Sequence, residues 1–551
     1  MRRRVRDLGV LVLVWMGVTV PFLDKAYHID DTVHVLQAEH IAAHPTRPLE
    51  MEIFWFQWPE WLADSNPITP PTWPYELAAA TALFGSGEIA FNSLAALHLL
   101  VLGLAVFCLA SRMVERPLLA ALFVITAPAA VVGRNLMLDV PMLSYLVAGL
   151  AAVVAGVEDD RIEVSIAGAL VIGIASITKL PGIVGVPVLL VYLALCGRLG
   201  WLPLVGLASA PLALWYAYQL AATGGIDLLR PRGGGGFEPQ HSFATAATVG
   251  WGHVPFWGGT VFTGAGYLAA LAIGRRRLAV LVGLAGVLAA LLAGWLAGLA
   301  GSPPPGQPGD EPGVPFALVL VFTCGGVALV VGAAAGARRL WRAGGTKRPL
   351  AGLLVAWAMG HVAFALAGAW EMNVRMAFLS AVPATILCLA AVEGVVASST
   401  MPRRVSAAVL GMLVAGTVIS LLLARADAEW ADGYRRVAAE IAPAHPEGRV
   451  WFVGHWGFQH YATAGGMIAY SPRDDRLAPG DFLVVPLAVA RQDVPEAVAR
   501  RLSLVERHTI TPALPLRTMG GGGGFYSTGW GAMPWGWSRQ PADMVMVMRH
   551  D

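Results

Sequence analysis

The sequence predicts an all-α polytopic membrane protein with about 13 transmembrane helices and a small C-terminal α/β domain. Of the 551 residues, 56% are hydrophobic and only 13% are charged, and the mean hydropathy is +0.62. Apolar windows of about 20 residues, enough to cross a bilayer core of about 30 Å, recur up to residue 424. After residue 425 the pattern changes to short alternating runs, which are typical of strands. We therefore divide the chain into a membrane domain, 1–424, and a small domain, 425–551.

The apolar windows give the expected spans. They lie at residues 8–23, 89–111, 117–133, 138–156, 163–178, 181–197, 201–222, 255–273, 278–300, 314–336, 350–370, 376–397 and 405–424. Lysine and arginine fall on alternate loops, as the positive-inside bias requires. The basic loops contain Arg2–Arg6, Arg112 and Arg116, Arg161, Arg198, Arg275–Arg277, Arg338–Arg348, and Arg403 with Arg404. The N-terminus is thus predicted to be cytoplasmic, and an odd number of spans places the C-terminal domain outside the cytoplasm.

The net charge and the longer polar segments narrow the function. A net charge of +2 offers no global field that would attract nucleic acid. The hydrophobic composition instead makes the lipid bilayer the expected surroundings. Residues 24–88 interleave aromatic and polar side chains, which predicts interfacial helices at headgroup depth. In the C-terminal domain we expect strands at 449–453, 481–485 and 544–548 and helices at 430–442 and 493–502.

The glycine run at 520–524, followed by Phe525, Tyr526 and several tryptophans, predicts a hinged aromatic flap. One interpretation is a surface loop with interfacial anchors. The other is a lid over an active site.

Asp30 and Asp31 follow the first apolar segment and begin an amphipathic pattern. An aspartate at the start of a helix accepts hydrogen bonds from free backbone N–H groups, which explains one carboxylate but not two. The second could act as a general base on an acceptor hydroxyl. The residues alone leave open which aspartate would do so.

Three further charged residues lie at the ends of predicted spans on the same side. Asp139 precedes a helix that starts with proline, so it is either a cap or a functional acid. Lys179 is a cation on the side that the charge bias disfavours, where it either binds a lipid phosphate or snorkels to the interface. Arg375 either pairs with Glu371 or clamps a phosphate. Together these residues suit attack by a deprotonated acceptor on a sugar carried by a lipid phosphate.

No cofactor is firmly indicated. His28, His34, His40 and His44 lie near Glu39, but their spacing matches no common zinc signature, so a divalent metal is only weakly supported. The competing functional class is a transporter or flippase for a lipid-linked or anionic solute. Transporters usually place charges near the midplane and contain inverted repeats, and neither feature is seen here. A third alternative is a catalytically inactive scaffold that displays the C-terminal domain.

The order of these motifs over residues 1–400 resembles the GT-C membrane glycosyltransferases, in the branch of protein O-mannosyltransferases, aminoarabinose transferases and lipopolysaccharide-core sugar transferases. In that branch the first outer loop opens with Asp-Glu, which Asp30-Asp31 matches with a shortened second acid. The other matching motifs are Thr69–Tyr75 with Leu83-Phe84-Gly85, Asp139-Val140-Pro141, Lys179-Leu180-Pro181-Gly182, and Arg375 with Pro383. His34 stands where the family often has an aromatic residue.

The resemblance implies an inverting transfer of a sugar from a polyprenyl-phosphate donor to an acceptor glycan, lipid or protein, in a bacterial plasma membrane. It implies that Asp30 is the general base, with Asp31 beside it, that Asp139 is a second active-site acid, and that Lys179 and Arg375 contact the donor phosphate. As acceptor or lid contacts we consider four residues: His34, Tyr75, Phe525 and Tyr526.

Overall fold

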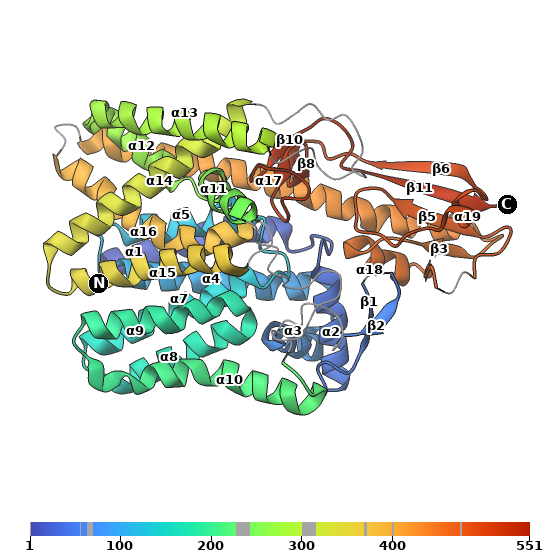
Figure 1. Ribbon diagram of the computed structural model, residues 1–551, viewed down its shortest axis with the longest axis horizontal. Helices are drawn as coiled ribbons and strands as arrows, with labels where there is room; N and C mark the ends of the chain where they lie inside the picture. The colour runs from blue at the N-terminus through green and yellow to red at the C-terminus, as the bar shows by residue number, and fades with distance from the viewer. Residues whose placement is uncertain are drawn as a thin grey trace.

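The computed structural model describes residues 2–55, 57–62, 70–226, 243–299, 316–368, 372–398, 402–473 and 476–551. A bundle of long apolar helices occupies one end of the molecule and a small β-sheet the other (Figure 1). Within the described residues, eight helices are long and apolar enough to cross a membrane, or nine if one bent pair counts as a span, and two apolar helices are shorter. The chain is an integral membrane protein, as its hydropathy predicted.

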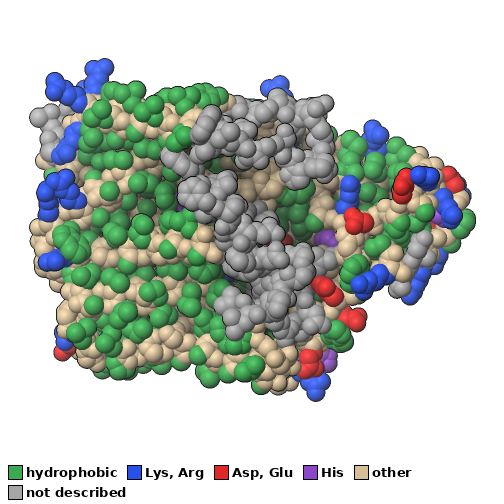
Figure 2. Space-filling view, viewed as in Figure 1, with side chains coloured by type: hydrophobic (Ala, Val, Ile, Leu, Met, Phe, Trp, Pro, Cys, Tyr) green, Lys and Arg blue, Asp and Glu red, His purple; other side chains and the backbone are tan. Residues whose placement is uncertain are grey.

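The bundle helices follow the predicted spans closely. Their bounds are α1 Arg2–Thr19, α4 Glu88–Ala110, α5 Pro117–Ile125, α6 Pro128–Val131, α7 Asp139–Glu158, α8 Ile162–Thr178, α9 Gly185–Leu195, α10 Pro203–Thr223, α11 Phe243–Thr260, α12 Thr263–Gly274, α13 Arg276–Leu299, α14 Phe316–Ala343, α15 Lys347–Gly368 and α16 Val374–Ser398. Short 3₁₀ turns are η1 Val20–Phe22, η2 Leu180–Val184 and η3 Leu199–Trp201. Lysine and arginine gather at the end of the bundle opposite the sheet (Figure 2).

Two predicted spans are not single straight helices. The window 117–133 breaks at Pro128 into α5 and α6, because proline cannot donate a helical hydrogen bond. The window 255–273 is bent by 84° between α11 and α12. Hydropathy detects apolar length but not such breaks, so these two windows were assigned the wrong shape.

Helix α17, Pro402–Ala444, joins the two parts of the molecule. Its 43 residues would extend about 65 Å, roughly twice the thickness of a bilayer core. The predicted span 405–424 and the predicted helix 430–442 are therefore one helix, and the predicted domain boundary lies inside it. Figure 1 shows α17 running from the bundle into the sheet.

The C-terminal sheet has the strand order β4-β3-β5-β11-β6. Strands β4 Ile468–Ala469 and β5 Phe482–Pro486 pair in parallel with β3 Val450–Phe452, and β11 Asp543–His550 pairs antiparallel with β5 and β6 Leu502–Ile510. Helices α18 Trp456–Ala464 and α19 Glu496–Ala499 complete the α/β domain. The three predicted strands are present. The predicted helix 493–502 is only one turn long, because β6 starts at Leu502.

The remaining short strands are β7 Leu516–Arg517, β8 Met519–Gly520, β9 Gly523–Gly524 and β10 Gly536–Trp537. The glycine run at 520–524 therefore forms part of the antiparallel pair of β8 and β9, while β7 pairs antiparallel with β10. In the first loop, α2 Asp31–Ala43 and α3 Thr72–Phe84 are helices, as expected. The aromatic stretch between these two helices is not helical as predicted, because β1 Glu52–Phe54 pairs antiparallel with β2 Pro59–Trp61. Proline suits an edge strand better than a helix interior.

Candidate functional site

The loop that enters α2 carries the site. Ile29, just before Asp30, has a φ of 50°, which a β-branched residue rarely adopts and which costs about 1–3 kcal/mol. The backbone N–H of Asp31 donates to the His28 carbonyl oxygen over 3.2 Å across this turn. Such strain persists only where surrounding contacts fix the loop, and it is often found at functional sites.

Asp31 supplies two of those contacts. Its Oδ2 accepts a hydrogen bond from the His28 N–H, and its Oδ1 accepts one from the Leu136 N–H, both over 2.9 Å. Asp31 is 3% exposed, and burial raises its pKa to about 7, although these bonds oppose the shift. Asp31 therefore fastens the loop before α7 to the start of α2.

Asp30 is the N-cap residue of α2, but its side chain makes no capping hydrogen bond. Within the described part of the chain its carboxylate has no hydrogen-bonding or ion-pairing partner within bonding distance. Burial raises the pKa of Asp30, and the charges of Arg375 and Lys179 lower it in part. The two adjacent acids thus have different roles. Asp31 accepts hydrogen bonds from the backbone, whereas the Asp30 carboxylate has no partner among the described residues and can interact with a ligand.

Asp139 lies between the two predicted cations. Its Oδ1 accepts a hydrogen bond from Lys179 Nζ over 2.6 Å, and its Oδ2 lies 3.8 Å from a guanidinium nitrogen of Arg375. Asp139 begins α7, Lys179 separates α8 from η2, and Arg375 is in the first turn of α16. Residues 40 to 236 positions apart therefore meet at one end of the bundle. Asp31 fastens Leu136, three residues before Asp139, to the turn that carries Asp30. The charges of Asp139 and of the two cations act on Asp30, so we treat the four as one site.

Arg375 is held by the protein on two further sides. Its guanidinium donates to the Tyr526 carbonyl oxygen over 3.1 Å and contacts Met137 Sδ at 3.0 Å. Glu371, the alternative partner, lies outside the described residues. The buried Arg375 Nε has no hydrogen-bond partner among the described side chains and backbone. One donor of the guanidinium is thus left for a ligand.

The four expected contact residues are in different surroundings. His34 on α2 is buried, and its pKa is lowered to about 4 by burial, with Lys179 and Arg375 adding to the effect, so the ring is neutral beside the site. Tyr75 on α3 instead donates its hydroxyl to the Pro45 carbonyl oxygen over 2.6 Å. Phe525 and Tyr526 are 0% and 2% exposed. In this conformation they pack beneath the surface, against α16.

Sequence reasoning missed a second charged cluster. Lys25 Nζ donates to Asp427 Oδ2 over 2.5 Å and also to Asn135 Oδ1. Asp427 accepts from the hydroxyls of Thr518 over 2.7 Å and Tyr526 over 2.9 Å. The signal was present, because an ionisable residue near membrane depth is a functional candidate by default. The predicted span ended at 424, so Asp427 was assigned to the water-exposed tail.

The four histidines of the first loop do not meet in one cluster, although the ring centroids of His40 and His44 lie 5.1 Å apart. His28 is buried between aromatic rings, 5.3 Å from the Trp430 ring centroid and 5.8 Å from that of Tyr526. His40 Nε2 contacts the Arg47 carbonyl oxygen at 2.8 Å. Among the described residues, no group of three histidine, cysteine, aspartate or glutamate side chains is arranged to hold a metal ion.

The two adjacent aspartates should respond differently to truncation. Asp31→Ala leaves two backbone N–H groups without an acceptor, each costing about 1–3 kcal/mol, so we expect a clear drop in the thermal unfolding midpoint. Asp30→Ala removes no hydrogen bond and should leave that midpoint near the wild-type value. Equal midpoints for the two variants in detergent would contradict these roles.

The chain is similar to several solved structures at low sequence identity. Structures of two such proteins, an oligosaccharyltransferase and ArnT, each share 15% identity with it. An Archaeoglobus fulgidus oligosaccharyltransferase tethered to an acceptor peptide has a TM-score of 0.48, covering 85% of this chain and 64% of that one. The chain thus spans less than two thirds of that protein. ArnT from Cupriavidus metallidurans has TM-scores of 0.43 in the apo state and 0.40 bound to undecaprenyl phosphate, each covering 98% of this chain and 97% of that one.

The search of curated proteins found no match. The family model described as dolichyl-phosphate-mannose-protein mannosyltransferase matches residues 68–216, a range that contains Asp139 and Lys179. This match confirms the predicted resemblance. Through residues 68–216 the chain carries the sequence pattern of the dolichyl-phosphate-mannose-protein mannosyltransferases, a family of GT-C glycosyltransferases.

Proposed function

We propose that this protein transfers a sugar from a polyprenyl-phosphate donor to an acceptor hydroxyl, with inversion, on the extracytoplasmic face of the membrane. The observation that carries the proposal is the carboxylate of Asp30, which has no partner among the described residues, beside Asp139, Lys179 and Arg375. This arrangement provides one free base and two cations at the end of an apolar helix bundle.

Asp30 is suited to the base step. The acceptor O–H gives its proton to the Asp30 carboxylate as the acceptor oxygen forms a bond to the anomeric carbon of the sugar. Burial raises the pKa of Asp30, which makes it a stronger base than an exposed aspartate. A single displacement of this kind inverts the configuration at the anomeric carbon.

Lys179 and Arg375 are suited to the leaving group. As the bond between the anomeric carbon and the phosphate oxygen breaks, that oxygen gains negative charge, which nearby cations stabilise. Asp139 holds the Lys179 ammonium at 2.6 Å and lies beside Arg375, so we assign it to positioning both cations. The free Nε of Arg375 is a further donor for a phosphate oxygen.

The membrane position fits a lipid-linked donor. Asp139 and Arg375 lie in the first turns of α7 and α16, and Lys179 lies at a break between apolar helices. Positions at the ends of apolar helices support a location at headgroup depth, where the phosphate of a membrane lipid would lie.

The test is an assay of the purified chain in proteoliposomes with labelled polyprenyl-phosphate sugars and a panel of glycan, lipid and peptide acceptors. Transfer of label to an acceptor, with the opposite anomeric configuration, supports the proposal. Movement of the labelled lipid or of an anionic solute across the bilayer, without transfer, would favour a transporter or flippase instead.

The pH dependence of transfer should report the charge on Asp30. Protonated Asp30 cannot accept a proton, so activity should fall as the pH falls through the pKa of Asp30. Because that pKa is raised, this acidic limb of the pH profile should lie above the ordinary value of about 4. Arg375→Met removes a cation that lowers this pKa, so the limb should move to higher pH. The measurement is kcat/KM against pH, with Arg435→Met, a half-exposed arginine, as the control. A limb that stays in place or moves to lower pH in Arg375→Met would count against Asp30 as the base.

A further inference from the structure

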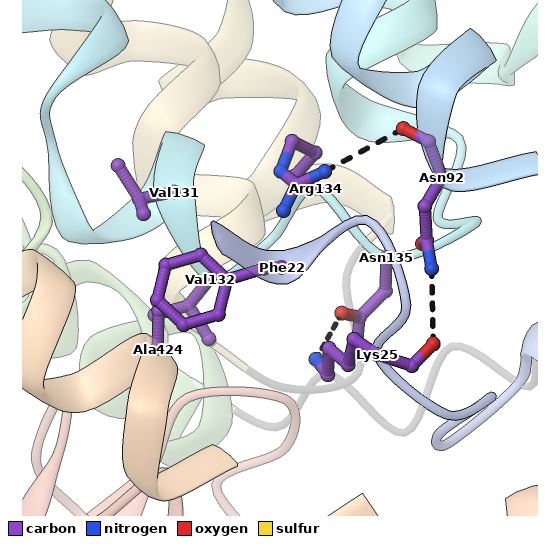
Figure 3. Close-up of a pocket in the computed structure, with 8 residues that line it drawn as sticks. All are labelled: Phe22, Lys25, Asn92, Val131, Val132, Arg134, Asn135 and Ala424. Carbon is purple, nitrogen blue, oxygen red and sulfur yellow. Dashed lines mark hydrogen bonds between the residues drawn. The ribbon is translucent and has the colours of Figure 1, made fainter. Parts of the chain in front are cut away.

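Two further cationic side chains, Lys25 and Arg134, line a pocket between η1, α6, the start of α4 and α17. It is lined by Phe22, Lys25, Asn92, Val131, Val132, Arg134, Asn135 and Ala424 (Figure 3). None of the four residues assigned to the proposed reaction lines it. The pocket therefore needs an explanation of its own.

Arg134 is the unusual residue in this pocket. It is 3% exposed, and within the described chain its guanidinium makes one long hydrogen bond, 3.5 Å to the Asn92 carbonyl oxygen, and no ion pair. Its Nε is buried without a partner among the described residues. Burial lowers the pKa of Arg134 to about 10, so the side chain keeps its charge at neutral pH. A buried, unpaired charge is costly unless an opposite charge accompanies it.

The other polar side chains of the pocket are already engaged. Lys25 pairs with Asp427 and also donates to Asn135. The Asn92 amide donates to the carbonyl oxygens of Leu23 and Lys25, and the Asn135 amide donates to the Tyr526 hydroxyl. Of the two charged residues lining the pocket, Lys25 is paired with Asp427, whereas Arg134 lacks a counter-charge within the described chain. The missing partner is an anion, and a planar guanidinium suits the paired oxygens of phosphate.

The surroundings point to a lipid as the source of that phosphate. The pocket is small, about 230 Å³ of empty space with its mouth included, so it has room for a headgroup phosphate but not for the rest of a lipid. Phe22, Val131, Val132 and Ala424 give the pocket apolar walls. Nearby Val20 on η1 and Leu422 on α17 are 52% and 41% exposed, as lipid-facing residues would be.

We propose that Arg134 binds the phosphate of a membrane phospholipid in this pocket, with the acyl chains lying along the apolar surface of η1 and α17. This site is separate from the donor cations Lys179 and Arg375. It does not depend on the proposed sugar transfer.

The test uses delipidated full-length protein in detergent, titrated with phosphatidylglycerol while the thermal unfolding midpoint is followed. We expect a saturable rise in the midpoint for the wild type and for Arg425→Gln, an exposed arginine next to Ala424 on α17. For Arg134→Gln, the phosphatidylglycerol concentration that gives half of this rise should be about tenfold higher or more, because the lipid phosphate loses a charged hydrogen-bonding partner. Native mass spectrometry should show one fewer tightly held lipid.

If the glutamine variant does not fold, Arg134→Lys replaces it in the test. Lysine keeps the positive charge but lacks the paired N–H donors of arginine, so this variant should bind the lipid more weakly than the wild type. Inorganic phosphate alone should raise the midpoint only at far higher concentration. Equal lipid affinity in the wild type and the Arg134 variants would overturn the proposal. An equal effect of inorganic phosphate and lipid at the same concentration would overturn the assignment to a lipid.

Discussion

Asp30→Asn is expected to lower the turnover of sugar transfer by about 100- to 10,000-fold, the usual contribution of a general base. Asparagine has nearly the same shape but cannot take the acceptor proton. Because the Asp30 side chain has no hydrogen bond to lose within the described chain, the thermal unfolding midpoint should stay close to that of the wild type. Donor affinity should change little, because Lys179 and Arg375 remain in place.

The assay for this prediction is single-turnover transfer from the labelled polyprenyl-phosphate sugar that the wild type uses. Asp24→Asn is the matched control, since Asp24 is an exposed aspartate of the same loop. It should transfer at the wild-type rate. Wild-type turnover in Asp30→Asn would remove Asp30 from the base role, while donor-binding measurements on Lys179→Met would still test the phosphate site separately.

Asp427→Asn should be among the most destabilising single substitutions in the chain. The Lys25 ammonium, buried and paired to Asp427 over 2.5 Å, would be left without its counter-charge. Breaking a buried ion pair from one side typically costs about 3–5 kcal/mol. The hydroxyls of Thr518 and Tyr526 would also lose a charged acceptor. We expect a large drop in the unfolding midpoint and reduced transfer.

The reduced transfer follows from what this ion pair joins. Lys25 lies five residues before Asp30, and the Tyr526 carbonyl oxygen accepts a hydrogen bond from Arg375. The C-terminal domain contacts the same loop directly: Thr32 Oγ1 donates to the Trp456 carbonyl oxygen over 2.6 Å. A Cβ at Gly457 would lie 2.0 Å from the Tyr27 carbonyl oxygen, so only glycine permits this approach. The domain thus braces the proposed base and one of the cations.

Differential scanning of detergent-solubilised protein checks the stability prediction. Asp432→Asn is the control on the same helix. Asp432 pairs with Arg435 at the surface, where such pairs contribute about 0–1 kcal/mol, and asparagine keeps a side-chain oxygen that can accept from the Ala26 N–H. Lys25→Met combined with Asp427→Asn should recover part of the loss, since no unpaired charge is then buried. A midpoint for Asp427→Asn as high as that of Asp432→Asn would show that the buried pair does not hold these elements together.

The same network bears on the glycine-rich segment. The Phe525 carbonyl oxygen accepts from the Val374 N–H over 3.2 Å, and the Tyr526 hydroxyl joins the Lys25 cluster. In this conformation the segment anchors the start of α16, where Arg375 lies. The prediction of a lid remains a prediction, because one conformation does not test a motion.

Local sequence determined the helices of this protein and the side chains available to the site. Apolar windows of bilayer length have one stable solution in lipid, the helix, since every backbone polar group must be paired internally. That is why the spans, and the positions of Asp30, Asp139, Lys179 and Arg375 at helix ends, could be predicted. The alternating runs after residue 425 likewise identified three of the strands.

Tertiary structure alone decided how those residues are used. Asp30 and Asp31 are identical in chemistry and adjacent in sequence. They differ because the N–H groups of His28 and Leu136 donate to Asp31, whereas Asp30 has no such partner among the described residues. The pairing of Lys25 with Asp427 spans 402 positions, and no local pattern encodes it. Helix breaks, the single long α17 and the unpaired charge of Arg134 depend in the same way on which segments pack together. Hydrophobic pattern is a property of neighbours along the chain, whereas the pairing of buried charges is a property of neighbours in space.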